Sequence, residues 1–306
     1  MEGPHVAITK LGARQHGIVA LAHALAAGLT LRQVELRVES GEWTALHEGV
    51  YLVGGAPLTW KGRILAACWA GGFRAVASHR SAAALHDLAG ARRDIAEITC
   101  PRWQRARHPR VEVHESKALD DRDITLVDGI PVTTVERALF DLSVVRSQLV
   151  VTMAFDKARR TGAVSFESVE ATLERLARRG RPGVRRLRAV LASRDPSEMP
   201  PESEMETWML DVIDRHGLPR PVPQFDVHVG DRFIARADAA YPEARIALEY
   251  QSYQEHAGPV PLVRDSNRRN RLRSVDWETT DVTNPALRAG GNTFCAAIRT
   301  ALRRAA

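Results

Sequence analysis

A proline-rich segment constrains the fold of this chain more than any other feature. Residues 192–201 contain three prolines among polar residues, and proline cannot continue a helix interior or a central strand. The sequence before this segment has mostly helical periodicity, and the sequence after it alternates as strands do. A softer boundary lies at 54–57, Gly-Gly-Ala-Pro. The 306 residues therefore predict an α/β (α+β) protein of three domains, over 1–56, 57–195 and 196–306.

The charge of the chain suggests an anionic partner. It has 43 basic and 37 acidic residues, a net charge of +6, and only four of the basic residues are lysines. Arginine matches the geometry of phosphate, and a basic surplus favours an anionic partner. A GC-rich genome, which inflates arginine and alanine together, explains the same composition, and charge alone does not choose between these explanations.

Cysteine usage and hydropathy exclude several classes of protein. Cys68, Cys100 and Cys295 are widely spaced and odd in number, which excludes a disulfide framework and a Cys-x-x-Cys metal site. No apolar run approaches the ~18 residues that cross a bilayer, and the first residues lack a signal-peptide layout. We therefore expect a cytoplasmic protein without a membrane partner, in which Cys68 and Cys100 are buried.

The N-terminal segment has the pattern of two helices followed by a hairpin. Residues 17–27 form an apolar stretch that predicts a helix, closed by Gly28. A second helix is predicted over 31–39, and two short strands over 43–46 and 49–53.

The start of the second helix indicates how this segment would meet DNA. Thr30 and Gln33 have the spacing of a capping box. In a winged helix this second helix enters the major groove, which makes Arg32, Gln33 and Arg37 the predicted DNA contacts. The alternative is a small helical domain that serves only for packing or for contact with a protein partner.

Several short motifs extend this interpretation to about residue 145. The region resembles the winged helix and the following domain of AbiEi-type antitoxins, through residues 28–30, 40–43, 48–51, 78–85 and 129–142. The resemblance implies sequence-specific DNA binding by a transcriptional autorepressor. It does not by itself imply a toxin partner, so a toxin or other protein partner stays open.

Two features of the middle segment have competing explanations. Ser78, His79 and Ser81 suggest a hydrolase, but no nucleophile elbow and no orienting acid accompany them, so we expect the serines to cap a helix. Arginines are dense between residues 175 and 188. They form either the solvated surface of a bridging helix or a surface that follows DNA phosphates.

The C-terminal segment predicts a pair of carboxylates on neighbouring strands. A helix that begins after Ser203 is followed by strands over 224–229, 233–240 and 245–251. Alternation places Glu249 on one face of the last strand, and the short turn places Asp238 on the neighbouring strand. Converging carboxylates repel unless a cation such as Mg²⁺ neutralises them. The alternative is an ordinary surface hairpin with scattered acids.

This segment resembles the PD-(D/E)XK nucleases, and more narrowly the Vsr-like endonuclease-fold domains of unknown function common in actinobacteria. The resemblance covers about 200–285 and implies a mixed central sheet and a Mg²⁺ or Mn²⁺ ion bound by Asp238 and Glu249. The catalytic residues it implies are Asp238, Glu249, Gln251, His256 and Glu206, and the predicted DNA contacts beside them are Arg264 and Arg268.

Two positions depart from the family pattern. Gln251-Ser252 stands where the family usually has Asp-Gly, and Asp276 stands where it has glycine. A neutral Gln251 binds a cation less strongly than a carboxylate does. The sequence therefore supports two hypotheses, a metal-dependent DNA endonuclease and a DNA-binding regulator or antitoxin with a degenerate nuclease domain.

Overall fold

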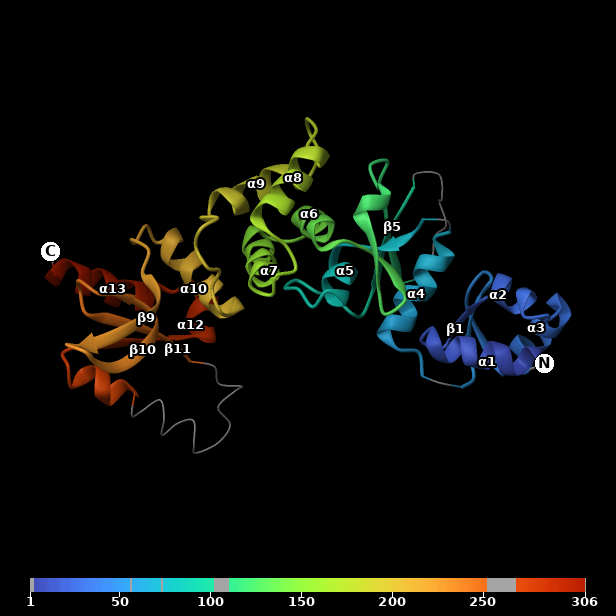
Figure 1. Ribbon diagram of the computed structural model, residues 1–306, viewed down its shortest axis with the longest axis horizontal. Coiled ribbons are helices and arrows are strands. Elements are labelled where there is room, and N and C mark those ends of the chain that lie inside the picture. The colour runs from blue at the N-terminus through green and yellow to red at the C-terminus, as the bar shows by residue number, and fades with distance from the viewer. Residues whose placement is uncertain (1–2, 56, 73, 102–109, 252–267, 306) are drawn as a thin grey trace. The chain divides into compact units, whose positions relative to one another are not determined.

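The computed structural model shows an α+β protein that divides into two compact units (Figure 1). It describes residues 3–55, 57–72, 74–101, 110–251 and 268–305. Unit 1 comprises Met1–Glu198 and unit 2 comprises Met199–Ala306. The expected division after residue 195 lies beside this boundary, and both of the expected segments 1–56 and 57–195 fall within unit 1.

Unit 1 begins with helices and a small antiparallel sheet of order β1-β3-β2. Its elements are α1 (Pro4–Arg14), β1 (Ile18–Ala20), α2 (Leu21–Ala26), α3 (Leu31–Glu39), β2 (Trp43–His47) and β3 (Val50–Val53). The predicted second helix, its Thr30–Gln33 capping box and both strands are confirmed. The predicted helix over 17–27 is wrong at its start, because the buried, β-branched Ile18 and Val19 pair with β3 as a strand.

A mixed five-stranded sheet of order β6-β5-β4-β8-β7 forms the middle of unit 1. Parallel pairs join β4 to β8 and β5 to β6, and the other neighbours are antiparallel. The elements of this region are α4 (Trp60–Ala70), β4 (Val76–Ala77), α5 (His79–Leu85), β5 (Ala96–Cys100), β6 (Val111–Glu115), the 3-10 helix η1 (Asp121–Asp123), β7 (Ile124–Val127) and β8 (Ile130–Thr133).

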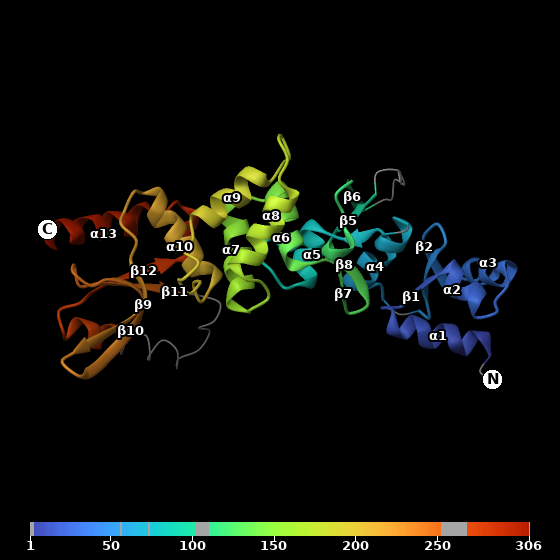
Figure 2. The same cartoon turned by 45° about the horizontal axis from the view of Figure 1, so that its top comes forward.

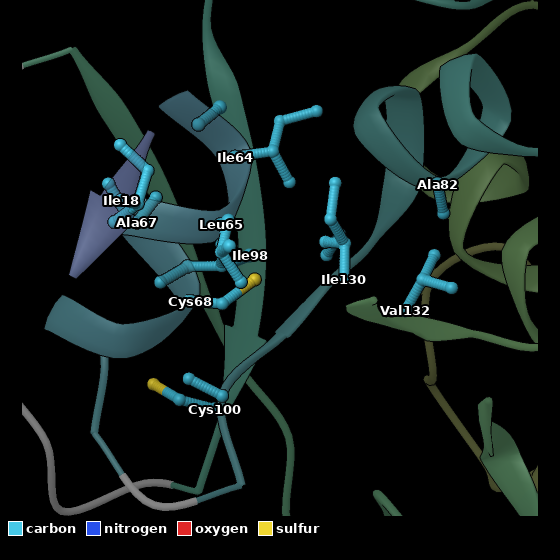
Figure 3. Close-up of a cluster of buried hydrophobic side chains, with 14 of the residues drawn as sticks. Ile18, Ile64, Leu65, Ala67, Cys68, Ala82, Ile98, Cys100, Ile130 and Val132 are labelled. Atoms are coloured by element: carbon cyan, nitrogen blue, oxygen red, sulfur yellow. The ribbon is translucent and has the colours of Figure 1, made fainter. Parts of the chain in front are cut away.

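The core of this sheet also includes residues of the N-terminal segment, Ile18 and Val50. Figure 3 shows Ile64 and Leu65 of α4 packed beside Ile98 of β5, and Ile18 of β1 belongs to the same buried cluster. Cys68 lies in this cluster with Cys100, so the expected burial of both thiols is confirmed. Burial raises the pKa of the Cys68 thiol to about 12, which keeps it unreactive.

Four helices follow the sheet and complete unit 1: α6 (Val135–Val145), α7 (Gln148–Arg160), α8 (Phe166–Leu176) and α9 (Val184–Ala192). Arg137 of α6 is 1% exposed and pairs with Asp141 of α6 and with Asp123 of η1. Its guanidinium also donates to the Ala118 carbonyl and to Ser116 Oγ. This buried arginine therefore joins the helices to the chain that leads into β7.

Unit 2 is built on a mixed four-stranded sheet of order β12-β11-β10-β9, in which only β11 and β12 are parallel among the described strands. Its elements are α10 (Glu204–Arg215), β9 (Val222–Val229), β10 (Arg232–Tyr241), β11 (Ile246–Gln251), helical residues 268–273, β12 (Glu278–Thr283), α12 (Asn284–Arg288) and α13 (Asn292–Ala305). The three predicted strands and the mixed sheet are confirmed.

The two faces of this sheet are covered by different helices. On one face, Leu248 and Val282 pack with Met209 of α10 and Phe294 of α13, and both helices are visible beside the strands in Figure 2. On the other face, Ala240 and Ala247 pack with Leu272 of the helical residues 268–273. Across the described residues, no helix is long and apolar enough to span a bilayer.

Candidate functional site

Strand register brings three acidic residues of unit 2 into one row. Ala240 pairs with Ala247 and Ala239 with Leu248, so the next position along this antiparallel pair brings Asp238 opposite Glu249. Glu249 in turn pairs with Asp281 of β12. Residues opposite each other on neighbouring strands share a face of the sheet. We call Asp238, Glu249 and Asp281 the acidic row, and its first two members are the predicted pair.

Arginines from the helical residues 268–273 lie against the acidic row. Arg268 forms an ion pair with Glu249, whose side chain is 0% exposed, and Arg269 pairs with Asp281 at 2.9 Å. Asp238 is half-buried, and its Oδ2 accepts a hydrogen bond of 2.7 Å from the backbone N–H of Tyr250. The predicted DNA contact Arg268 therefore balances the charge of a predicted metal ligand.

Glu206, the third predicted acid, approaches the row from the start of α10. Ser203 caps the helix by accepting from the Glu206 N–H, and its hydroxyl donates to Glu206 Oε1 at 3.1 Å. Gln224 Nε2 of β9 donates to Glu206 Oε2, also at 3.1 Å. Burial raises the pKa of Glu206, and the nearby charge of Asp238 raises it further. Glu206 and Asp238 thus share one electrostatic environment.

The remaining predictions for unit 2 fall at the edge of the described chain. Gln251 ends β11, where its backbone pairs with Thr283. The side chain of Gln251, together with all of His256 and Arg264, lies outside the described residues.

The predicted DNA contacts on α3 engage in local bonds. Arg32 pairs with Glu35 at 3.3 Å and with Glu39 at 3.1 Å. Gln33 Oε1 accepts from the Thr30 N–H at 2.8 Å to close the capping box. Arg37 donates to the Gln33 carbonyl at 2.8 Å. Arg37 also lies 3.6 Å from Glu42, so both arginines of α3 have nearby glutamates that balance their charge.

The arginine-dense region between α8 and α9 is less evenly neutralised. Arg178, Arg179, Arg181, Arg185 and Arg188 line a hollow of about 540 Å³, and none of the described residues that line it is acidic. We call these five residues the arginine hollow. Two nearby arginines are not part of the hollow and have other partners. Arg175 pairs with Asp123, and Arg186 donates to the Ser143 carbonyl.

A second group of ligand-type side chains lies in unit 1, where the sequence did not suggest one. His79 of α5, Glu97 of β5 and His114 of β6 bring donor atoms within 4.8 Å of one another. We call these three residues the His–Glu cluster. Among the residues that the structure describes, no other three histidine, cysteine or acidic side chains converge as closely. The His–Glu cluster could hold a metal ion.

Neighbouring residues fix the geometry of the His–Glu cluster. The two imidazole rings stack, with centroids 3.6 Å apart and planes inclined by 20°. Ser78 Oγ lies 2.9 Å from His79 Nδ1 and accepts from Thr99 Oγ1 at 2.8 Å. Burial lowers the pKa of His79 to about 3, and the charge of His114 contributes, so His79 is neutral.

Ser78 and Ser81 make buried hydrogen bonds within the fold. These bonds differ from the helix caps that the sequence predicted. Ser78 occupies the position before α5, but its hydroxyl bonds with His79 and Thr99 and makes no cap bond in the described chain. Ser81 Oγ accepts from the Glu97 N–H at 2.8 Å. Ser78 and Ser81 are both 0% exposed, which agrees with the rejection of a serine nucleophile.

Comparison with known proteins gives relatives without an assigned role. No family model matches the chain. It is 33% identical over 151 residues to two proteins of Mycobacterium tuberculosis, uncharacterized protein MT2308 of strain CDC 1551 / Oshkosh and uncharacterized protein Rv2248 of strain ATCC 25618 / H37Rv. Each match covers 49% of this chain and 54% of the relative, so the chain spans about half the length of the curated relatives it matches.

One solved structure is also similar to this chain, the crystal structure of the RV2827C protein from Mycobacterium tuberculosis. The sequence identity is 15% and the TM-score is 0.41, over 76% of this chain and 88% of that chain.

Proposed function

We propose that this protein is a metal-dependent DNA endonuclease, with phosphodiester hydrolysis at the acidic row and a winged helix over 1–56 that targets DNA. The observation that carries the proposal is the register of β10 and β11, which sets Asp238 opposite Glu249 on one face of the sheet. Two facing carboxylates repel each other, and a divalent cation bound between them relieves this repulsion. Such a pair can therefore serve as the metal ligands of a nuclease site.

The order of elements in unit 2 supports the same proposal. Helix α10 leads into the antiparallel strands β9, β10 and β11, and a helical segment then leads into β12, parallel to β11. This order resembles the core of the PD-(D/E)XK nucleases. Gln251 remains the departure, because an amide in place of a carboxylate gives a weaker third ligand.

Asp238 and Glu249 would hold a Mg²⁺ or Mn²⁺ ion. When bound, such an ion acidifies a water molecule and offsets the charge that grows on the phosphate oxygens. Arg268 forms an ion pair with Glu249. It would contact the DNA backbone if a cation took over the charge of that carboxylate. Glu206, with its raised pKa, and His256 are the proposed proton carriers, and Gln251 would orient water.

Double-stranded DNA is the proposed partner, in the cytoplasm and without a membrane. The arginine hollow supplies unbalanced positive charge for phosphates, whereas α3 is locally balanced. We therefore expect Arg185→Ala with Arg188→Ala to weaken duplex binding and its salt dependence more than Arg32→Ala with Arg37→Ala does. A binding assay over a salt series measures both. Equal effects would contradict the role of the hollow, and affinity that ignores salt would contradict DNA binding by unit 1.

Plasmid cleavage tests the proposed reaction. Wild type should cut supercoiled plasmid with Mg²⁺ or Mn²⁺ and not with EDTA, and Asp238→Asn should abolish cleavage while it retains duplex binding. Asp231→Asn makes the same chemical change at an exposed turn of the same sheet and should cut normally. If wild type cuts DNA with neither metal, or if Asp238→Asn cuts as wild type does, the endonuclease proposal is wrong.

The pairing of Glu249 with Arg268 favours a second candidate, a DNA-binding regulator or antitoxin with a degenerate nuclease domain. In that case the arginine replaces the metal permanently and stabilises the sheet. Tight duplex binding without cleavage, and calorimetry that detects no Mg²⁺ or Mn²⁺ binding sensitive to Asp238→Asn, would establish this candidate. A toxin or other protein partner stays open for it.

A further inference from the structure

We propose that the His–Glu cluster of unit 1 binds a transition-metal ion of the Zn²⁺ class, at a site independent of the acidic row. The ligands are one imidazole nitrogen each from His79 and His114 and one carboxylate oxygen from Glu97. Two histidines and one glutamate are a typical protein ligand set for Zn²⁺. Mg²⁺ prefers oxygen ligands alone, and the acidic row offers only those.

The contact with Ser78 engages one ring nitrogen of His79 and leaves the other for an ion. Ser78 Oγ already accepts a hydrogen from Thr99, and it lies 2.9 Å from Nδ1 of His79. A proton on Nδ1 satisfies this contact and leaves a lone pair on Nε2, the nitrogen that remains for an ion. Metal-binding histidines commonly donate their second nitrogen to such an outer partner, which fixes the ring.

The backbone of His79 adds an independent observation. Its φ is 50°, in the left-handed region, and among the non-glycine residues described at positive φ it is the only buried one. This conformation is unfavourable for a residue with a side chain and persists only where the surrounding contacts hold it. At the start of α5 it orients the imidazole toward β5 and β6.

His114 contributes a buried ring nitrogen that makes no hydrogen bond with the described residues. Its Nε2 lacks a hydrogen-bond partner among them, and the carboxylates of Glu97 and Glu112 lie 3.9 Å away, too far for a hydrogen bond. An ion between His114 and Glu97 would satisfy this nitrogen. The His114 side chain is 22% exposed, so solvent reaches the cluster from this side.

The charge around the cluster admits a cation. Arg80 pairs with Glu97 and lies 2.7 Å from Glu112, so one positive group faces two carboxylates. Arg80, Glu97 and Glu112 together carry a net negative charge, which favours a bound cation. The Arg80 pair explains why Glu97 can be buried, but it does not explain why two imidazoles converge on the same carboxylate.

Binding of Zn²⁺ and Co²⁺ to the metal-stripped full chain tests this proposal. In excess Mg²⁺, wild type should bind one equivalent of Zn²⁺ in competition with a chromogenic chelator. Co²⁺ at the same site should give the intense visible bands of a low-coordinate ion with nitrogen ligands. A hundredfold excess of Zn²⁺ over its Kd should raise the Tm of unit 1 by about 5–10 °C.

Matched variants separate ligand loss from structural damage. His114→Phe keeps an aromatic ring against His79 but removes both nitrogens, and it should weaken Zn²⁺ binding by at least about 100-fold, the upper range for outer-shell partners. Glu115→Gln lies on the same strand, where alternation places it on the face opposite His114, and should bind normally. Asp238→Asn should bind Zn²⁺ normally as well, which separates this proposal from the endonuclease proposal.

Three results would each overturn the proposal. The first is wild type that binds no stoichiometric Zn²⁺ or Co²⁺ in excess Mg²⁺. The second is a folded His114→Phe protein with wild-type affinity, and His114→Gln takes its place if His114→Phe does not fold, as judged by circular dichroism. The third is Co²⁺ bound to wild type without the visible bands of nitrogen ligands.

Discussion

Glu97 of unit 1 and Glu249 of unit 2 make an instructive pair. Each glutamate lies within a strand, each side chain is 0% exposed, and each forms an ion pair with an arginine, Arg80 or Arg268. A buried carboxylate needs such a counter-charge, since desolvation of a lone charge costs several kcal/mol. The two strands thus meet the same electrostatic requirement in the same way.

The neighbours of the two glutamates differ, and they decide what each site can bind. Glu97 faces two imidazoles, whereas Glu249 stands between Asp238 and Asp281. Nitrogen ligands favour Zn²⁺ and related ions, and oxygen ligands favour Mg²⁺ and Mn²⁺. Identical burial and pairing therefore lead to different metal preferences, which follow from the residues next to the glutamate.

The largest expected effect comes from changing each glutamate to glutamine. Glu249→Gln should reduce Mg²⁺-dependent plasmid cleavage by about a thousandfold, because a bound metal contributes several kcal/mol at about 1.4 kcal/mol per tenfold in rate. Glu97→Gln should leave cleavage by folded protein unchanged and remove Zn²⁺ binding. Cleavage rates and Zn²⁺ competition with a chelator are measured for both variants. Equal loss of cleavage in both would contradict the assignment of different metals to the two sites.

A smaller effect is expected from removing the arginines. Arg80→Met and Arg268→Met each leave a buried carboxylate without its partner and should each lower the free energy of unfolding by about 3 kcal/mol. Zn²⁺ should restore stability in Arg80→Met, and Mg²⁺ or Mn²⁺ should restore it in Arg268→Met, because a cation replaces the lost charge. Urea denaturation with each metal measures this, and rescue by the opposite metal would contradict the assignments.

The smallest expected effect concerns the pH dependence contributed by Glu206. Its pKa is raised in the folded protein, chiefly by burial, so the folded state holds this proton more tightly than the unfolded state does. The free energy of unfolding therefore falls as pH rises from the ordinary carboxyl pKa to the raised one, and this contribution is constant above it.

Glu206→Gln should flatten this fall relative to wild type, by about 1.4 kcal/mol for each unit of pKa difference. Glu204→Gln makes the same change on the same helix and should keep the wild-type slope. Denaturation series between acid and neutral pH compare the three proteins. A Glu206→Gln curve parallel to wild type would mean that the pKa of Glu206 is not raised in the folded protein.

The acidic row could be predicted from sequence because its first two members are local. Asp238 and Glu249 belong to adjacent strands joined by one short turn, and period-two alternation places them on a known face. Asp281 was missed because it comes from a parallel strand, whose register depends on a connection and not on a turn.

The His–Glu cluster could not be predicted in the same way. His79, Glu97 and His114 come from a helix start and two strands, and the pairing of Thr99 with His114 sets their approach. In β6, Val111 and Val113 alternate with Glu112 and His114, which indicates that Glu112 and His114 share one polar face but not what that face contacts. Only the order of strands in the sheet supplies that information.

The buried Arg137 also has a consequence for how unit 1 opens. Its guanidinium bonds to Asp123, Asp141 and the Ala118 carbonyl. If the chain between Ser116 and Asp123 came loose, this buried charge would lose most of its partners. Such a local fluctuation is too costly to compete with loss of the whole unit. The backbone amide of Asp123, which bonds to the Asp120 carbonyl, should therefore exchange with solvent hydrogen as slowly as the core amides of α6, although it lies in a single short turn.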